Sequence, residues 1–220
     1  MYNGTIFVRA DSIVELTYNF GHMIDGGGIF LLSRVIQIDS NASLTFSHNS
    51  ADLNGGALRL SNGELIVKPG ANLNFINNSA TLGGAIYLIN ATIHVDTDNV
   101  YFYGNRGTHG GALYFIYGKI SICSNRTIMF IENAAHTQGG AIYVESDIDS
   151  TVVADNFSRL VFLNNSAFQG GALSVVPSSF TVKVRYHSSI RFINNTAHDV
   201  GGAVYADVQA AAPCLFMVTD

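Results

Sequence analysis

The hydrophobic positions of this chain alternate with polar ones, and the alternation recurs in blocks. Each block opens with two apolar positions one residue apart, and the second is a phenylalanine: Leu44/Phe46, Leu73/Phe75, Val100/Phe102, Ile128/Phe130, Leu160/Phe162 and Ile190/Phe192. Two more alternating runs follow, such as Ile86/Leu88 after a Gly-Gly pair and then Ile93/Val95. A period of two predicts strands with one buried face, and no stretch has the 3.6-residue period of a helix.

The blocks are copies of one unit. From Phe46 to Phe192 the successive phenylalanines are 29, 27, 28, 32 and 30 residues apart, and a worn copy begins at Tyr18 and keeps Gly26-Gly27. Equivalent strands recur in the same chain direction, as in a coil in which each strand stacks on the equivalent strand of the next turn. We therefore predict an all-β fold, a right-handed single-stranded parallel β-helix of about seven rungs, each made of three short strands.

Residues 1–220 are predicted to form one such domain, with clear repeats over 44–206. Neither end carries the polar cap that a solenoid needs for solubility. We therefore expect this domain to be part of a longer rod, continued end to end by further rungs of its parent chain.

An asparagine follows each phenylalanine by three residues: Asn49, Asn78, Asn105, Asn133, Asn165 and Asn195. Asparagine tolerates left-handed backbone and hydrogen-bonds its neighbours in turns. Identical side chains stacked rung on rung can also bond one another. We predict a structural turn ladder of these six residues. The Gly-Gly pairs that follow are expected where the coil bends, because glycine admits positive φ and close backbone approach.

Composition narrows the function classes. The chain is 48% hydrophobic and 12% charged, which excludes disorder, and its net charge is −5. No basic stripe is present, which argues against a nucleic-acid partner. The apolar runs are short and strand-like, so no membrane span is expected in this segment. Nothing after Met1 has the features of a signal peptide. In a fragment, this says nothing about where the protein is found.

Eight Asn-x-Ser/Thr sequons indicate a secreted or cell-surface glycoprotein, most simply eukaryotic. The candidate glycosylation sites are Asn3, Asn41, Asn77, Asn90, Asn125, Asn156, Asn164 and Asn194. Three of them arise from the repeat itself. The two cysteines, Cys123 and Cys214, lie three rungs apart, about 14 Å, which is too far for a disulfide between them. Cys214 is free to pair beyond this segment.

The combination of F-x-x-N with G-G-A-[ILV], as in Phe75-Ile-Asn-Asn78 followed by Gly83-Gly84-Ala-Ile, resembles the repeat of the chlamydial polymorphic outer-membrane proteins. Six copies in register, over residues 44–206, make the paired motif specific. The resemblance implies a surface-exposed or secreted right-handed β-helix and suggests adhesion. It implies no catalytic residue and no cofactor.

One outward position of the strand after Gly-Gly is mostly aromatic. Its residues are Phe30, Arg59, Tyr87, Tyr114, Tyr143, Ser174 and Tyr205. Of these, Arg59, Tyr87, Tyr114, Tyr143 and Tyr205 form a candidate contact strip for a protein or glycan ligand on another surface. The alternative is stacking within the molecule that stabilises adjacent rungs.

Candidate catalytic chemistry is sparse. Asp96 and Asp98 share an outward face about 7 Å apart, a separation suited to glycoside hydrolysis, yet no acids stand in the rungs beside them. His136 and His198 recur two rungs apart, about 10 Å, too far to share a metal. We predict no catalytic residue, metal or cofactor. The function expected is non-enzymatic adhesion, display or scaffolding outside the cell. The alternatives are a polysaccharide lyase or hydrolase and an inert spacer rod.

Overall fold

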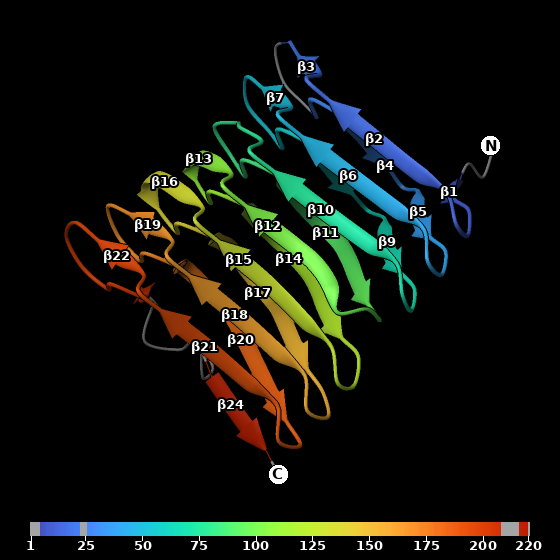
Figure 1. The fold of residues 1–220 in the computed structure, drawn as a ribbon. Coiled ribbons are helices and arrows are strands. Elements are labelled where there is room, and N and C mark those ends of the chain that lie inside the picture. The colour runs from blue at the N-terminus through green and yellow to red at the C-terminus, as the bar shows by residue number, and fades with distance from the viewer. Residues whose placement is uncertain (1–4, 23–25, 208–215, 220) are drawn as a thin grey trace.

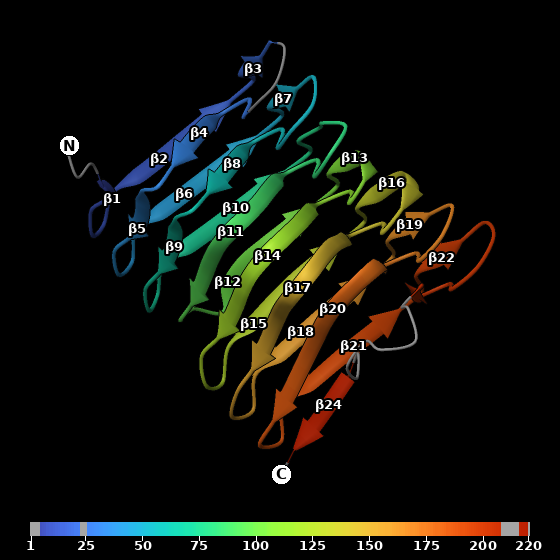
Figure 2. The ribbon, with the colours of Figure 1, turned by 180° about the vertical axis from the view of Figure 1, so that it is seen from behind.

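The computed structural model describes residues 5–22, 26–207 and 216–219, and these form strands and turns with no helix. The strands pair in parallel from rung to rung and stack into a solenoid (Figure 1). The predicted all-β parallel solenoid of about seven rungs is confirmed. The first rung lies beside the N-terminus and the last beside the C-terminus, and the view from behind shows the same order (Figure 2).

The phenylalanine repeats form one sheet of seven strands, which we call the Phe sheet. Its strands, in spatial and chain order, are β2 (Ile13–Thr17), β6 (Ser43–Ser47), β10 (Asn72–Ile76), β12 (Asn99–Tyr103), β15 (Thr127–Ile131), β18 (Arg159–Leu163) and β21 (Ser189–Ile193). The register places Phe46 beside Phe75 and Phe75 beside Phe102. It places Leu16 beside Phe46, so the worn first copy is in register from Leu16 and not from Tyr18.

The runs after each Gly-Gly pair form an 11-stranded sheet, which we call the Gly-Gly sheet. Its strands are β1 (Thr5–Val8), β4 (Ile29–Leu32), β5 (Val35–Ile38), β8 (Leu58–Ser61), β9 (Glu64–Val67), β11 (Ile86–Val95), β14 (Leu113–Ile122), β17 (Ile142–Ala154), β20 (Leu173–Arg185), β23 (Val204–Ala206) and β24 (Phe216–Thr219). The second and third predicted runs merge here into single long strands, β11, β14, β17 and β20. In β11 the two runs meet at Asn90, whose φ of 47° marks a bend within the strand.

A third side of the coil, which we call the short-strand face, was not predicted. Its strands are β3 (Phe20–Gly21), β7 (Ser50–Ala51), β13 (Arg106–His109), β16 (Ala134–Gln138), β19 (Ser166–Ala167) and β22 (Thr196–Ala197). Single bridges through Ser79 connect β7 to β13. These segments are short and rich in Ser, Thr and Ala, so they carry no alternating apolar signal.

The three sides enclose one apolar core. Phe46, Phe75, Phe130 and Phe162 are at most 1% exposed and Phe102 is 4% exposed, which confirms the predicted strand phase. Neighbouring rings, through to the half-buried Phe192, stack with centroids 4.6 to 5.1 Å apart. This distance matches the roughly 4.8 Å spacing of paired strands, so the rung repeat itself imposes the ring stack.

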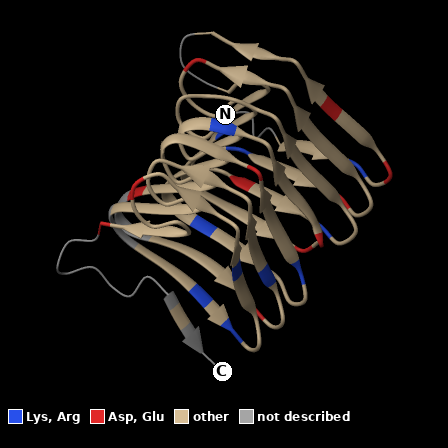
Figure 3. Cartoon of the chain, turned by 60° about the vertical axis from the view of Figure 1, so that its left-hand side comes forward, with Lys and Arg blue, Asp and Glu red and all other residues tan. Residues whose placement is uncertain are grey.

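The Gly-Gly pair serves two separate needs. Gly83 has a φ of +65°, a region that side chains with a Cβ rarely adopt. Gly84 has ordinary φ, but a Cβ there would collide with the carbonyl oxygens of Arg106 and Gly111. The first glycine therefore allows the turn, and the second allows close approach of the next rung. Charged side chains are few, and many lie along the turns at one corner of the stack (Figure 3).

Candidate binding face

The turn asparagines form a continuous ladder inside the coil. Oδ1 of Asn78 accepts from the backbone nitrogen of Asn49 at 2.9 Å and from its Nδ2 at 3.0 Å. Nδ2 of Asn78 in turn donates to the carbonyl of Phe46 and to Oδ1 of Asn105. The same bonds connect Asn105, Asn133, Asn165 and Asn195, and Asn19 joins at the first rung. Asn49 to Asn165 are fully buried, so this ladder is a structural element and offers no ligand site.

The ladder residues are not left-handed, contrary to the reason given for them from sequence. The left-handed position is the residue just before each one, as at His48, Asn77, Asn164 and Asn194. The ladder position therefore needs asparagine for its carboxamide, which supplies both the donor and the acceptor that the stack uses. The preceding position needs a residue that tolerates positive φ.

The outward aromatic column exists in the predicted register. Tyr87 pairs with Arg59 on one side and with Tyr114 on the other, and Tyr114 pairs with Tyr143. The ring centroids are 5.3 and 5.1 Å apart. Beyond Tyr143 the register continues to Ser174 and then to Tyr205, which is half-buried.

The three central tyrosines are nevertheless not accessible. Tyr87, Tyr114 and Tyr143 are 9%, 5% and 7% exposed, and they form a second small core outside the coil. The side chains that pack against them are Leu82, Ile89, Ile116 and Val176. These three positions therefore lack the exposed surface expected of the predicted contact strip, because rings stacked at the rung spacing cover one another and the flanking aliphatic residues cover the rest.

A hydrogen bond connects this tyrosine cluster to the exposed carboxylate of Glu145. The Tyr114 hydroxyl donates to Oε2 of Glu145, and burial together with this bond raises the pKa of Tyr114 above its usual value. Burial and the Glu145 charge raise the pKa of Tyr143 to about 12. The ring of His109 lies 5.0 Å from that of Tyr143, and burial lowers the pKa of His109. Each shift favours the neutral form, so the cluster behaves as part of the packed interior.

Arg59 covers the other end of the column. Its guanidinium lies 5.3 Å from the ring centroid of Phe30 and 5.4 Å from that of Tyr87, a cation–π arrangement. Its Nε also reaches the Ser61 hydroxyl at 3.4 Å. Arg59 is half-buried, while Phe30 is 50% exposed. The accessible parts of the predicted strip therefore lie at its two ends, at Arg59 and at Tyr205.

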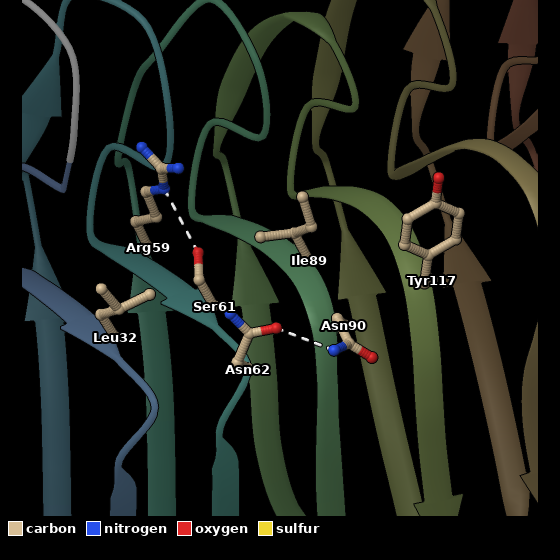
Figure 4. Close-up of a pocket in the computed structure, with 7 residues that line it drawn as sticks. All are labelled: Leu32, Arg59, Ser61, Asn62, Ile89, Asn90 and Tyr117. Atoms are coloured by element: carbon tan, nitrogen blue, oxygen red, sulfur yellow. Dashed lines mark hydrogen bonds between the residues drawn. The ribbon is translucent and has the colours of Figure 1, made fainter.

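A hollow of about 540 Å³ opens next to Arg59 on the outward side of the Gly-Gly sheet (Figure 4). Its lining residues are Leu32, Arg59, Ser61, Asn62, Ile89, Asn90 and Tyr117. They come from β4, β8, β11 and β14 and from the turn after β8, so four successive rungs contribute. Nδ2 of Asn90 donates to Oδ1 of Asn62 at 2.8 Å. The volume lies within the range typical of small-molecule sites.

Apart from Arg59, sequence reasoning gave no binding role to the residues of this hollow. Leu32 ends β4, whereas Ile89 and Tyr117 lie at the bends within β11 and β14, and none of the three belongs to a motif. Spacing was the available sequence signal for this hollow. Leu32, Ser61 and Ile89 occupy the same outward position, two residues after the aromatic column.

The acidic pair considered for catalysis is held by a cation. Nε of Arg126 lies 3.1 Å from Asp96 Oδ1, and its Nη1 lies 3.4 Å from Asp98 Oδ2. Sequence reasoning missed this partner because it comes from the next rung, 28 to 30 residues later. Among the described residues, no group of three or more His, Cys, Asp or Glu side chains is arranged to hold a metal ion.

Cys123 is exposed and is a free thiol, and partial desolvation of its sulfur together with the charge of Asp96 raises its pKa. Cys214 lies outside the described residues, as does the sequon at Asn3. The other seven sequon asparagines share two properties: each is exposed, and each has positive φ, between 44° and 60°. They are Asn41, Asn77, Asn90, Asn125, Asn156, Asn164 and Asn194. None of the described segments forms a helix with the length and hydropathy of a membrane span.

Four segments match the Chlamydia polymorphic membrane protein (Chlamydia_PMP) repeat, at residues 43–61, 72–88, 127–145 and 189–207. Each begins in a strand of the Phe sheet and ends in or just after the first part of the Gly-Gly strand of the same rung. The chain is also 34% identical over 97 residues to "Probable outer membrane protein pmp7" of Chlamydia pneumoniae. That alignment covers 40% of this chain and 10% of the relative, so the chain spans only a small part of the relative's length. No solved structure matches the chain. The chain thus carries Chlamydia polymorphic membrane protein repeats in four places, and each matched segment lies within one rung of its β-solenoid.

Proposed function

We propose that this chain is a segment of a non-enzymatic rod at the cell surface, acting in adhesion or display. The observation that carries the proposal is the coincidence of the four matched repeats with single rungs of the solenoid. The relative that aligns with part of this chain is named as a probable outer membrane protein. A rod built of such rungs suits display, because its length holds outward side chains away from the surface that anchors it.

The arrangement around Asp96 and Asp98 argues against polysaccharide cleavage. A general acid needs a raised pKa, usually from burial or a like charge. Both carboxylates here are about half-exposed and are ion-paired with the Arg126 guanidinium, so neither lies in the buried setting of a general acid. This supports a role that needs no catalytic group.

An inert spacer is the second candidate. The burial of Tyr87, Tyr114 and Tyr143 favours it, since rings that pack on each other hold rungs together and meet no partner. The hollow beside Arg59 favours adhesion, because a spacer needs no concave outward site.

Two measurements test the proposal. Antibodies raised against the folded chain should label intact, unpermeabilised cells of the source organism, and protease added outside should remove the signal. Beads coated with the 220-residue chain should bind cultured cells better than beads coated with the same chain after heat unfolding. Labelling that needs permeabilised cells would exclude the surface role, and equal binding by both bead types would leave only the spacer.

A further inference from the structure

We propose that the hollow between Leu32 and Tyr117 is a binding site for one neutral pyranose residue of a glycan. This inference rests on the proposed adhesive function and names the ligand class for it. It replaces the tyrosine strip as the place where a ligand meets the Gly-Gly sheet, since the three central tyrosines are covered.

The apolar side of the hollow suits the C–H face of a sugar ring. Leu32 is 54% exposed, and Ile89 and Tyr117 are half-buried, so all three present surface to a ligand. Figure 4 shows Leu32, Ile89 and the ring of Tyr117 spread along the hollow, on strands of different rungs. Sites for small ligands combine such apolar surface with a few fixed polar groups.

The polar side is the carboxamide pair Asn62 and Asn90. Their mutual bond of 2.8 Å uses one donor and one acceptor and fixes both side chains. Within the described part of the chain, it leaves Nδ2 of Asn62 to donate and Oδ1 of Asn90 to accept. A sugar hydroxyl is both donor and acceptor, so neighbouring hydroxyls of one ring match this pair. Because the two carboxamides are already ordered, binding costs little further side-chain entropy.

The wall behind this pair is rigid. Arg59 is held between the rings of Phe30 and Tyr87, and Ile89 packs on the buried tyrosine cluster. The tyrosines therefore support the hollow without touching its contents. None of the seven lining residues is acidic, which makes a cationic ligand a poor match. The one cationic group, Arg59, already stacks on aromatic rings, and this favours a neutral sugar over an acidic one.

Saturation-transfer NMR tests this with the methyl glycosides of glucose, galactose, mannose and N-acetylglucosamine as probes. Two variants remove side chains from opposite sides of the hollow and are compatible with the backbone conformation at each position. Tyr117→Asn deletes the ring, and Asn62→Gly deletes the carboxamide, while Asn and Gly both tolerate the positive φ found there. Asn164→Gly is the matched control, because Asn164 is equally exposed and left-handed but lies after β18, on another corner.

At least one probe should bind the unmodified chain, and each pocket variant should bind it about tenfold more weakly or worse. Asn164→Gly should bind like the unmodified chain. No binding by any probe, or equal weakening in the control, would overturn the site. So would a covalent glycan on Asn90 in protein from its native source, because it would fill the hollow. If beads coated with Asn62→Gly chain adhere as well as unmodified ones, adhesion stands and this site does not carry it.

Discussion

Oδ1 of Asn105 accepts two hydrogen bonds from Asn78, at 2.9 Å from the backbone nitrogen and at 3.0 Å from Nδ2, although the residues are 27 positions apart. Each carboxamide in the ladder thus satisfies two donors of the rung before it. Both residues are fully buried, where an unpaired polar group is far more costly than in water. The ladder therefore penalises any rung that slips out of register.

Replacing Asn133 by Ala should lower the free energy of unfolding by about 1–3 kcal/mol for the buried groups it leaves unpaired. Asn105 would lose the acceptor for its backbone nitrogen and for its Nδ2, and the Phe102 carbonyl would lose a donor. Chemical denaturation measures the change. Asn74→Ala is the control, since Asn74 makes one bond at the surface of the Phe sheet. An unchanged midpoint for Asn133→Ala would contradict the ladder's contribution.

Truncating Phe130 to Ala should cost about 3–5 kcal/mol, because it removes a buried ring from the middle of a stack. Phe130 is 1% exposed and lies 4.6 Å from Phe102 and 5.1 Å from Phe162, measured between ring centroids. Tyr103→Ala, at a position 40% exposed on a neighbouring strand, should have a much smaller effect in the same denaturation experiment. Similar losses for the two variants would show that the ring column is not the core.

Alkaline pH should destabilise the chain through the buried tyrosines. Their pKa is raised on folding, to about 12 for Tyr143, so the folded state favours the neutral hydroxyl. The stability gained from this is complete below the unfolded pKa of about 10 and is lost as pH rises through the folded value. The melting temperature should therefore decrease as the pH rises from the unfolded to the folded pKa. In a titration followed by phenolate absorbance, a fraction of the tyrosines should ionise at higher pH than free tyrosine does.

The double variant Tyr114→Phe/Tyr143→Phe is the control for that titration. It keeps the rings and removes the hydroxyls, so the late-ionising fraction should decrease and the fall in melting temperature over the same pH range should shrink. An identical pH profile in the double variant would assign the alkaline loss to other groups.

Asp96→Asn should change the free energy of unfolding by less than about 1 kcal/mol, because exposed ion pairs contribute little. It should also leave the chain as inactive towards acidic polysaccharides as the unmodified protein, measured by release of reducing ends. Turnover by the unmodified chain that vanishes in Asp96→Asn would revive the enzyme alternative, and Asp39→Asn, in another ion pair of the turns, would show whether the loss is specific.

The repeating part of the fold could be predicted from the sequence, and the rest could not, for physical reasons. Phe46 and its equivalents reveal strand phase because burial forces a period of two. The short-strand face escaped because Ser50-Ala51 and its equivalents are short segments of small and polar residues, which carry no alternating apolar pattern. Tyr87 was correctly placed outward and wrongly taken as exposed, since alternation tells which side a residue faces and not what covers it.

The sequons illustrate the same point. The seven described sequon asparagines all occupy exposed corners with positive φ, where asparagine is the preferred residue after glycine. Their number therefore has a structural explanation that does not involve glycosylation. Treatment of the native protein with an amidase that removes N-linked glycans, followed by mass measurement, decides whether any of them is modified.

The asparagine ladder forms the same hydrogen bonds between successive rungs, and this makes the rungs interchangeable. The interval between ladder partners varies from 27 to 32 residues, yet the bonds across it stay near 3 Å. The additional residues of the longer repeats are accommodated outside the ladder and do not disturb the stack. Duplication or deletion of one whole repeat in the gene therefore changes the reach of the protein and leaves its cross-section unaltered. A site built on four consecutive rungs, such as the hollow beside Arg59, would be displaced intact by such a change outside those rungs, so reach and recognition can evolve separately.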